Sequence, residues 1–476
     1  MVDNNESKKR VVLITLDGWG AGLAGPANIF NEETAPKLSA LLDSYPYTQL
    51  ATCASDLGYE KQVITDSKIG HLALALATPL EKQSGGFFKE EELAAALKQL
   101  KQKESACHVL LDARNIEALD DFKWCVTLAE RKKIKQVCVH LLLSELDNFD
   151  LTAWQALMEG HDNIKIIQLI KAGYALNDSY EWEKTALAYR AVVEGESNDA
   201  VIKKIEATEI VLAENDVVLF LGRELSVWFQ LASSLTAFEF GEFERKLPGG
   251  LKCLSVDSGA KQRGLALPKL LAQHDLKQVV ITESYGAMAA CYYGGGLACS
   301  PEAGQDWVIF NSPLYSELPN EILESSEKVI DYSIDLINDQ DYDFVHINLA
   351  TLDLARQCGD VELVTRCLEA LDKLSARVIK AALDRNFLVL LGSTCSASEA
   401  IVDVVSGAQT TKNTNALVPF VIIASELEGR SFSSLEGARS EVDAAVSHLS
   451  LLDIAPTVLA YFNIHQPSSM SGKSLI

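Results

Sequence analysis

Short apolar runs alternate with long helical patterns along nearly the whole of this 476-residue chain. Such alternation is typical of parallel sheets covered by helices on both faces, because parallel strands are joined by helical crossovers. We predict strands at 11–16, 106–111, 136–143, 164–170, 216–221, 277–282, 344–348, 387–392 and 418–423. The clearest helical patterns lie at 116–131, 180–195, 319–337 and 360–385. The predicted fold class is therefore α/β, with parallel-rich sheets flanked by helices.

Two polar segments mark possible domain joints. Residues 84–86 (SGG) precede a charged helical pattern at 89–103, and residues 257–264 (DSGAKQRG) follow the last strand of the middle section. We predict a discontinuous domain from 1–84 and 263–476, with a second domain inserted at 85–262. The alternative is one large α/β domain with surface loops.

Composition and charge limit the classes of function. Hydrophobic residues at 48% and charged residues at 23% are ordinary for a globular protein. A formal charge of −24 argues against nucleic acid and anionic membranes as partners. No apolar run approaches the roughly 18–20 residues of a membrane span, and the N-terminus shows no signal-peptide pattern. Ten cysteines without a CxxC pair indicate reduced thiols, so we expect a cytoplasmic protein.

Two polar residues stand where a metal-dependent phosphoryl-transfer enzyme would need them. Asp17 ends the first predicted strand, and Ser67 begins an apolar helical pattern. A carboxylate at a strand end and a serine at a helix start can bring an oxygen ligand and a nucleophile to one metal ion. A helix N-cap is the other interpretation of Ser67, and it is the one we favour, because the serine directly precedes an apolar helical run.

Four segments carry a family resemblance: LDGWG (16–20), SKIGHL (67–72), GYALNDSYEWEKTALAYRAVVEGE (173–196) and the C-terminal stretch 451–475. Together they resemble cofactor-independent phosphoglycerate mutase, within the alkaline phosphatase superfamily. The resemblance implies an alkaline-phosphatase-like domain of metalloenzyme type, interrupted by an inserted transferase-like domain. It also implies two divalent ions, usually manganese, and a serine that carries the phosphoryl group between two hydroxyls of phosphoglycerate.

The metal-ligand positions implied by the resemblance are only partly kept. Three match, at Asp17, Ser67 and Asp353. Four are replaced, at Gln357, Thr394, Cys395 and Asn413. The first ion would be held by Asp17, Ser67 and the positions of Thr394 and Cys395, and the second by the positions of Asp353, Gln357 and Asn413. We expect a buried, inert thiol at Cys395 and structural roles for the histidines, His71 included.

Most of the substrate-binding positions that the resemblance implies are also replaced. Two are retained, at Asp147 and Arg223. Five are replaced, at Leu146, Asp178, Glu181, Ser226 and Ser284. Each lost arginine removes a charge-assisted phosphate contact of about 1.5–3 kcal/mol, and a carboxylate in its place adds repulsion.

We therefore predict a catalytically inactive homologue, a pseudoenzyme, in which Ser67 is a vestigial nucleophile and no cofactor is expected. Its pocket between the domains would bind an unknown small molecule, uncharged or cationic, or the protein would bind a protein partner. One alternative is an active mutase or phosphatase with a remodelled site that uses Ser67 and manganese or magnesium. Another is an abundant structural or storage protein.

Overall fold

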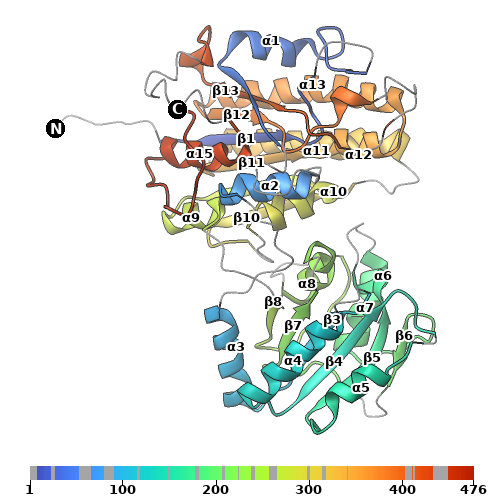
Figure 1. Ribbon diagram of the computed structural model, residues 1–476. Coiled ribbons are helices and arrows are strands. Elements are labelled where there is room, and N and C mark those ends of the chain that lie inside the picture. Colours follow the sequence, from blue (N-terminus) through green and yellow to red (C-terminus); the bar gives the residue numbers. More distant parts are fainter. Residues whose placement is uncertain are drawn as a thin grey trace, which may run out of the picture. The chain divides into compact units, whose positions relative to one another are not determined.

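The computed structural model describes residues 8–22, 27–52, 66–79, 90–114, 118–147, 149–176, 182–205, 210–222, 225–236, 242–256, 265–296, 301–312, 318–339, 341–401, 410, 413–432 and 449–476. The chain forms two compact units (Figure 1). Unit 1 comprises Met1–Lys82 and Gly264–Ile476, and unit 2 comprises Gln83–Arg263. These bounds lie within two residues of the joints expected from the sequence, while the metalloenzyme and transferase characters of the units stay predictions.

Unit 1 is built on a seven-stranded sheet in the order β10-β9-β11-β1-β12-β13-β2. β13 runs antiparallel to both of its neighbours, and all other neighbouring pairs are parallel. The strands are β1 (Val11–Leu16), β2 (Tyr47–Leu50), β9 (Gln278–Glu283), β10 (Gln305–Phe310), β11 (Phe344–Leu349), β12 (Leu388–Gly392) and β13 (Val418–Ile423).

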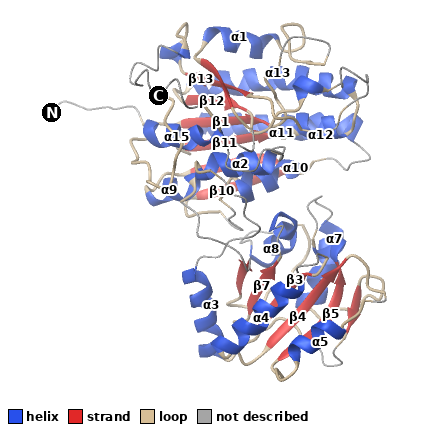
Figure 2. Cartoon of the chain, viewed as in Figure 1, coloured by secondary structure: helices blue, strands red, loops and turns tan. Residues whose placement is uncertain are grey.

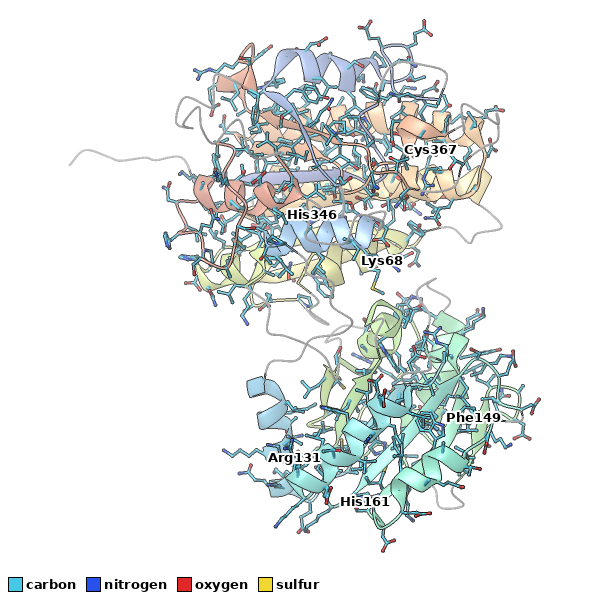
Figure 3. The ribbon with its side chains drawn as sticks, viewed as in Figure 1. Lys68, Arg131, Phe149, His161, His346 and Cys367 are labelled. Atoms are coloured by element: carbon cyan, nitrogen blue, oxygen red, sulfur yellow. The ribbon has the colours of Figure 1, made fainter. Side chains whose placement is uncertain are left out.

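Both faces of this sheet are covered, because alternate side chains of a strand point to opposite faces. In β1, Val12, Ile14 and Leu16 join one apolar core, whereas Val11 and Leu13 join the other. The first core packs under α1 (Pro36–Ser44), α11 (Leu318–Asp339), α12 (Thr351–Gln357) and α13 (Val361–Asp384), and includes Cys367 (Figure 3). The second packs under α2 (Ser67–Leu76), α9 (Leu267–Gln273), η7 (Leu451–Asp453) and α15 (Ile454–Tyr461). Unit 1 also contains α10 (Ser284–Ala287), η2 (Met288–Tyr293), η3 (Ser398–Ala400) and η4 (Ser425–Leu427).

Unit 2 repeats this plan on a six-stranded sheet in the order β6-β5-β4-β3-β7-β8, in which only β6 is antiparallel to its neighbour. The strands are β3 (Cys107–Asp112), β4 (Val137–Leu143), β5 (Ile164–Lys171), β6 (Ile202–Lys204), β7 (Val217–Leu221) and β8 (Lys252–Val256). The helices are α3 (Glu90–Lys103), α4 (Ala118–Lys132), α5 (Thr152–Met158), α6 (Ala172–Ala175), α7 (Trp182–Val193), η1 (Leu225–Trp228) and α8 (Phe229–Thr236) (Figure 2).

A buried chain of polar side chains crosses the sheet of unit 2. Gln168 donates from Nε2 to Nδ1 of His140 at 2.9 Å, and the rings of His140 and His108 meet at 3.0 Å. Nε2 of His108 lies 3.4 Å from Oδ2 of Asp216. All four side chains are buried. Burial lowers the pKa of His140 well below its ordinary value, and the neighbouring His108 adds to the effect. The expectation of structural roles is consistent with this arrangement.

All nine predicted strands are present in the structure, and so are the six predicted helical patterns, counting the apolar one that begins at Ser67. Four further strands, β2, β6, β8 and β10, lack an apolar run of the predicted kind. They are the outermost strands of the two sheets. Across the described parts of the chain, no helix combines the length and apolar character that a membrane crossing requires.

Candidate functional site

The candidate site lies in unit 1 at the carboxyl ends of β1, β11 and β12. Asp17 follows β1 directly, and its backbone N–H donates to the carbonyl of Leu349 at the end of β11. The carbonyl of Asp17 in turn accepts from the N–H of Asp353 at 3.1 Å. Thr394 and Cys395 follow β12. Parallel strands end at one edge of their sheet, which brings residues distant in the sequence to one place.

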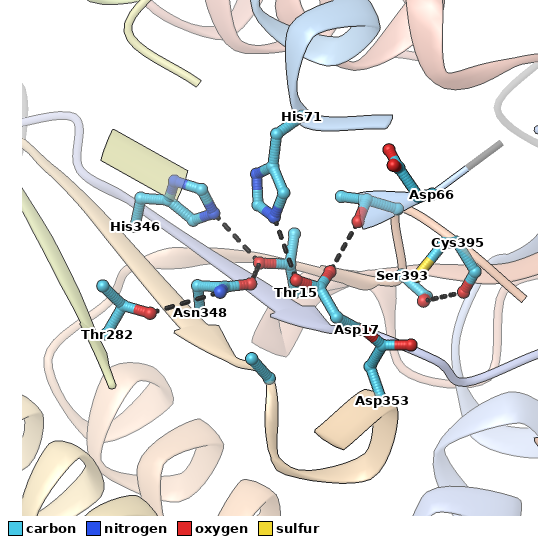
Figure 4. Close-up of polar contacts among 12 residues, drawn as sticks. Thr15, Asp17, Asp66, His71, Thr282, His346, Asn348, Asp353, Ser393 and Cys395 are labelled. Carbon is cyan, nitrogen blue, oxygen red and sulfur yellow. Dashed lines mark hydrogen bonds and ion pairs between the residues drawn. The ribbon is translucent and has the colours of Figure 1, made fainter. Parts of the chain in front are cut away.

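Both oxygens of the Asp17 carboxylate receive hydrogen bonds from the protein itself. Oγ1 of Thr394 donates to Oδ1 at 2.5 Å. Nε2 of His71, which points from α2 toward the strand end, lies 3.2 Å from Oδ2 (Figure 4). All three side chains are fully buried, so water cannot compete for the carboxylate. Asp17 is therefore paired inside the core, and His71 is its partner.

Helix α2 lies unusually close to the segment that follows β12. A Cβ atom at Gly70 would be 2.1 Å from the carbonyl oxygen of Thr394, so only glycine permits this approach. The N-cap of α2 is Asp66, whose side chain accepts from the N–H of Ile69. Ser67 is the first residue of the helix and not its cap, which corrects that interpretation of Ser67. Asp is among the residues preferred at an N-cap, because its carboxylate accepts from a backbone N–H that has no partner within the helix.

Asp353, in the first turn of α12, is the second retained carboxylate. Nη2 of Arg356 lies 3.1 Å from Oδ1 of Asp353. Nε2 of Gln357 donates to Oδ2 at 3.3 Å, and the hydroxyl of Tyr285 lies 3.4 Å from the same oxygen. Gln357 also donates to the Tyr285 hydroxyl. Burial raises the pKa of the Asp353 carboxyl, an effect that Arg356 opposes.

Asn413 is brought to the same place through Arg356. Its Oδ1 accepts from Nη2 of Arg356 at 2.5 Å, the nitrogen that also pairs with Asp353. One guanidinium nitrogen therefore joins two of the three positions that the resemblance assigns to the second metal ion. The third, Gln357, reaches Asp353 directly.

Cys395 is fully buried. Burial raises the pKa of its thiol well above the ordinary value, and the neighbouring carboxyls of Asp353 and Asp17 add to the effect. The side chain is therefore a neutral thiol at physiological pH, as expected from the sequence. A metal ligand would need the thiolate.

A second layer of hydrogen bonds lies beneath Asp17. Oγ1 of Thr15 donates to Oδ1 of Asn348 at 2.7 Å and lies 3.0 Å from Nε2 of His346 (Figure 4). The amide nitrogen of Asn348 donates to Thr282 at 3.2 Å. These side chains link β1, β11 and β9 and hold the strand ends in register.

The described donors do not suit a pair of divalent ions. Within the described ranges, no group of three or more His, Cys, Asp and Glu side chains has an arrangement that could hold a metal ion. Each retained carboxylate already accepts hydrogen bonds from neighbouring side chains. The replacements supply a hydroxyl, a neutral thiol and two amides, so none of the four brings a carboxylate or an imidazole.

The expected substrate-binding positions are only partly visible. In unit 2, Leu146 is buried in the apolar core and Asp147 is exposed. In unit 1, Oγ of buried Ser284 accepts from the N–H of Ser312 at 2.9 Å. Arg223, Asp178 and Glu181 lie outside the described residues, and for Ser226 only the backbone, in η1, is described. The substrate-binding roles stay predictions.

Three residues of the site were not assigned to it from the sequence: Arg356, Tyr285 and His71, of which only His71 was named and was expected to have a structural role. Helical spacing offers a signal for two of them. His71 lies four residues after Ser67 and Arg356 three after Asp353, and such pairs share one face of a helix. No comparable signal marks Tyr285, which reaches Asp353 only through the sheet topology.

Comparison with known proteins covers almost the whole chain. A family model described as the metalloenzyme superfamily matches residues 9–466. The chain is 26% identical over 523 residues to the 2,3-bisphosphoglycerate-independent phosphoglycerate mutase of Moorella thermoacetica, with 98% of each chain covered. The protein of that name from Clostridium botulinum is 26% identical over 528 residues, covering 99% of this chain and 100% of its own. The solved structure of Leishmania mexicana phosphoglycerate mutase has a TM-score of 0.58 at 14% identity, covering 99% of this chain and 98% of that one, which shows the shared fold.

Proposed function

This chain belongs to the metalloenzyme superfamily, as the resemblance of its four segments predicted, and we propose from that premise that it acts by binding and not by phosphoryl transfer. Its relatives carry the name phosphoglycerate mutase. The proposal is that this member has kept their fold and lost their chemistry, and that it acts in the cytoplasm.

The observation that supports the proposal is the state of the Asp17 carboxylate. Thr394 and His71 hold its two oxygens inside the core. An incoming ion would have to displace these buried contacts and would find a hydroxyl and a neutral thiol at the two replaced positions. Loss of groups that merely orient a ligand already costs about 10–100-fold in metal affinity, and loss of the ligands themselves costs more.

Without a metal ion, Ser67 has no activator. A serine hydroxyl attacks phosphate readily only when a base takes its proton or a metal ion lowers its pKa. No hydrogen bond joins Ser67 to His71 among the described residues, and His71 is fully buried beside Asp17. Ser67 is then a helix residue without a catalytic role.

The ligand of such a protein is an uncharged or cationic small molecule, or a protein partner. A formal charge of −24 disfavours a multiply charged phosphate ester. Amides such as those of Gln357, which is exposed, and Asn413, which is partly exposed, are polar groups that can orient neutral ligands in pockets.

Metal analysis combined with activity assays tests the proposal. The purified chain is incubated with Mn²⁺ or Mg²⁺, desalted, analysed by plasma mass spectrometry and assayed for mutase and general phosphatase activity. We expect no retained ion and no turnover, while the Clostridium botulinum relative, treated in parallel, serves as the positive control. Interconversion of phosphoglycerate isomers that disappears in a Ser67→Ala variant would refute the proposal.

A further inference from the structure

We infer that the guanidinium of Arg356 takes the place of a divalent cation, so that this site carries its own positive charge. The inference rests on the proposed loss of metal binding. Nη2 of Arg356 lies 3.1 Å from Oδ1 of Asp353 and 2.5 Å from Oδ1 of Asn413. The resemblance assigns both of these positions to the second ion. A single cationic nitrogen thus bridges two groups that an ion would have bridged.

The surroundings of Asp353 require a positive charge. Its side chain is 5% exposed, and that of Arg356 is 4% exposed. The carboxyl of Asp17 lies near enough to act on the same group. A buried carboxylate without a partner is strongly destabilising, and two neighbouring carboxylates are worse. Where relatives of this fold would use a metal ion, the described residues offer Arg356 instead.

The hydrogen bonds of Arg356 indicate that charge is what it contributes. Its Nε and Nη1 atoms are buried and have no hydrogen-bond partner among the residues that the structure describes. Among the described residues, Arg356 therefore acts through Nη2 alone, by its ion pair with Asp353 and its hydrogen bond to Asn413. Its position is set by the helix, because residues three apart in α12 lie on one face and Arg356 therefore reaches Asp353.

Two further side chains, Gln357 and Tyr285, contact Asp353 beside this ion pair. Oδ2 of Asp353 accepts from Gln357, and the Tyr285 hydroxyl lies next to the same oxygen. Both oxygens of Asp353 are therefore satisfied from within the chain. A divalent ion can enter only if the guanidinium leaves, which makes Arg356 both the stabiliser of the site and the group that excludes metal.

Removing the charge while keeping the bulk tests the inference. We compare wild type, Arg356→Met and Arg356→Lys in thermal unfolding with and without MnCl₂, and measure Mn²⁺ binding by calorimetry. The wild type should show no Mn²⁺ response. Arg356→Met should lower the melting temperature by about 10 °C, because it leaves a buried carboxylate unpaired, and Mn²⁺ should restore part of the loss. Arg356→Lys, the matched control, should unfold close to wild type and ignore Mn²⁺.

A double variant keeps the inference testable if Arg356→Met does not fold. Asp353→Asn combined with Arg356→Met removes both charges and should be more stable than Arg356→Met alone, without a Mn²⁺ response. Equal or lower stability of the double variant would overturn the charge-pairing argument. Failure of Mn²⁺ to stabilise a folded Arg356→Met variant would also overturn it, while the proposed function would stand. Tight Mn²⁺ binding by the wild type would overturn both.

Discussion

Replacing Gly70 by alanine should separate α2 from the segment that follows β12. The added Cβ would lie 2.1 Å from the carbonyl oxygen of Thr394 and 2.8 Å from its carbonyl carbon, whereas ordinary contacts begin near 3.4 Å. The helix must therefore move by more than about 1 Å, since backbone cannot yield as a flexible side chain does. Such overpacking costs about 3 kcal/mol, against about 1 kcal/mol gained from the higher helix propensity of alanine.

The expected net loss is about 2 kcal/mol, or about 5 °C in melting temperature for a unit of this size. Urea denaturation followed by circular dichroism measures it. Gly173→Ala is the matched control, because Gly173 is also helical and a Cβ there meets nothing within 4 Å. That variant should be as stable as wild type or slightly more so. A Gly70→Ala variant of wild-type stability would refute the proposed close approach.

Two further predictions concern protonation. Burial lowers the pKa of His140, so the unfolded chain binds a proton below about pH 6.5 that the folded chain does not. Stability is therefore complete above that pH and falls below it, by about 1.4 kcal/mol between pH 7.5 and 5.5 for this one group. Urea midpoints should show a smaller change in His140→Gln, and equal changes in both proteins would contradict the assignment. Burial raises the pKa of the Cys395 thiol, with Asp353 adding to it, so iodoacetamide should label Cys395 only after denaturation. Peptide mass spectrometry after labelling in native buffer measures the labelling rate of each cysteine. Labelling of Cys395 as fast as that of the partly exposed Cys358 would contradict the prediction.

The strands that the sequence predicted are the inner strands of both sheets. Strands such as β1 and β4 are buried on both faces, so every residue is apolar or buried and the run is visible in the sequence. The outermost strands have partly exposed side chains, and β10, with only its first residue fully buried, is an example. Their pairing is set by a neighbouring strand and not by their own composition, which is why an apolar run does not mark them.

The site could be located from the sequence, but its internal pairing could not. Strand-end positions and family spacing placed Asp17 and Asp353 at one sheet edge. The sequence could not show that His71 turns toward Asp17, because that depends on how closely α2 approaches the strand end. It also gave no reason to connect Arg356 with Asn413, since the contact spans 57 positions and depends on tertiary packing.

The order of the strands in unit 1 has a consequence for biosynthesis. β1 occupies an inner position between β11 and β12, yet it leaves the ribosome long before either neighbour is translated. The whole of unit 2 is one continuous stretch that is completed in the interval. Domains fold as units during translation, so the inserted unit can finish folding while an apolar hexapeptide upstream still lacks partners. Until Phe344 and the residues after it emerge, Val11–Leu16 is therefore an apolar strand segment without its two partner strands, and such a segment is prone to pair with other molecules.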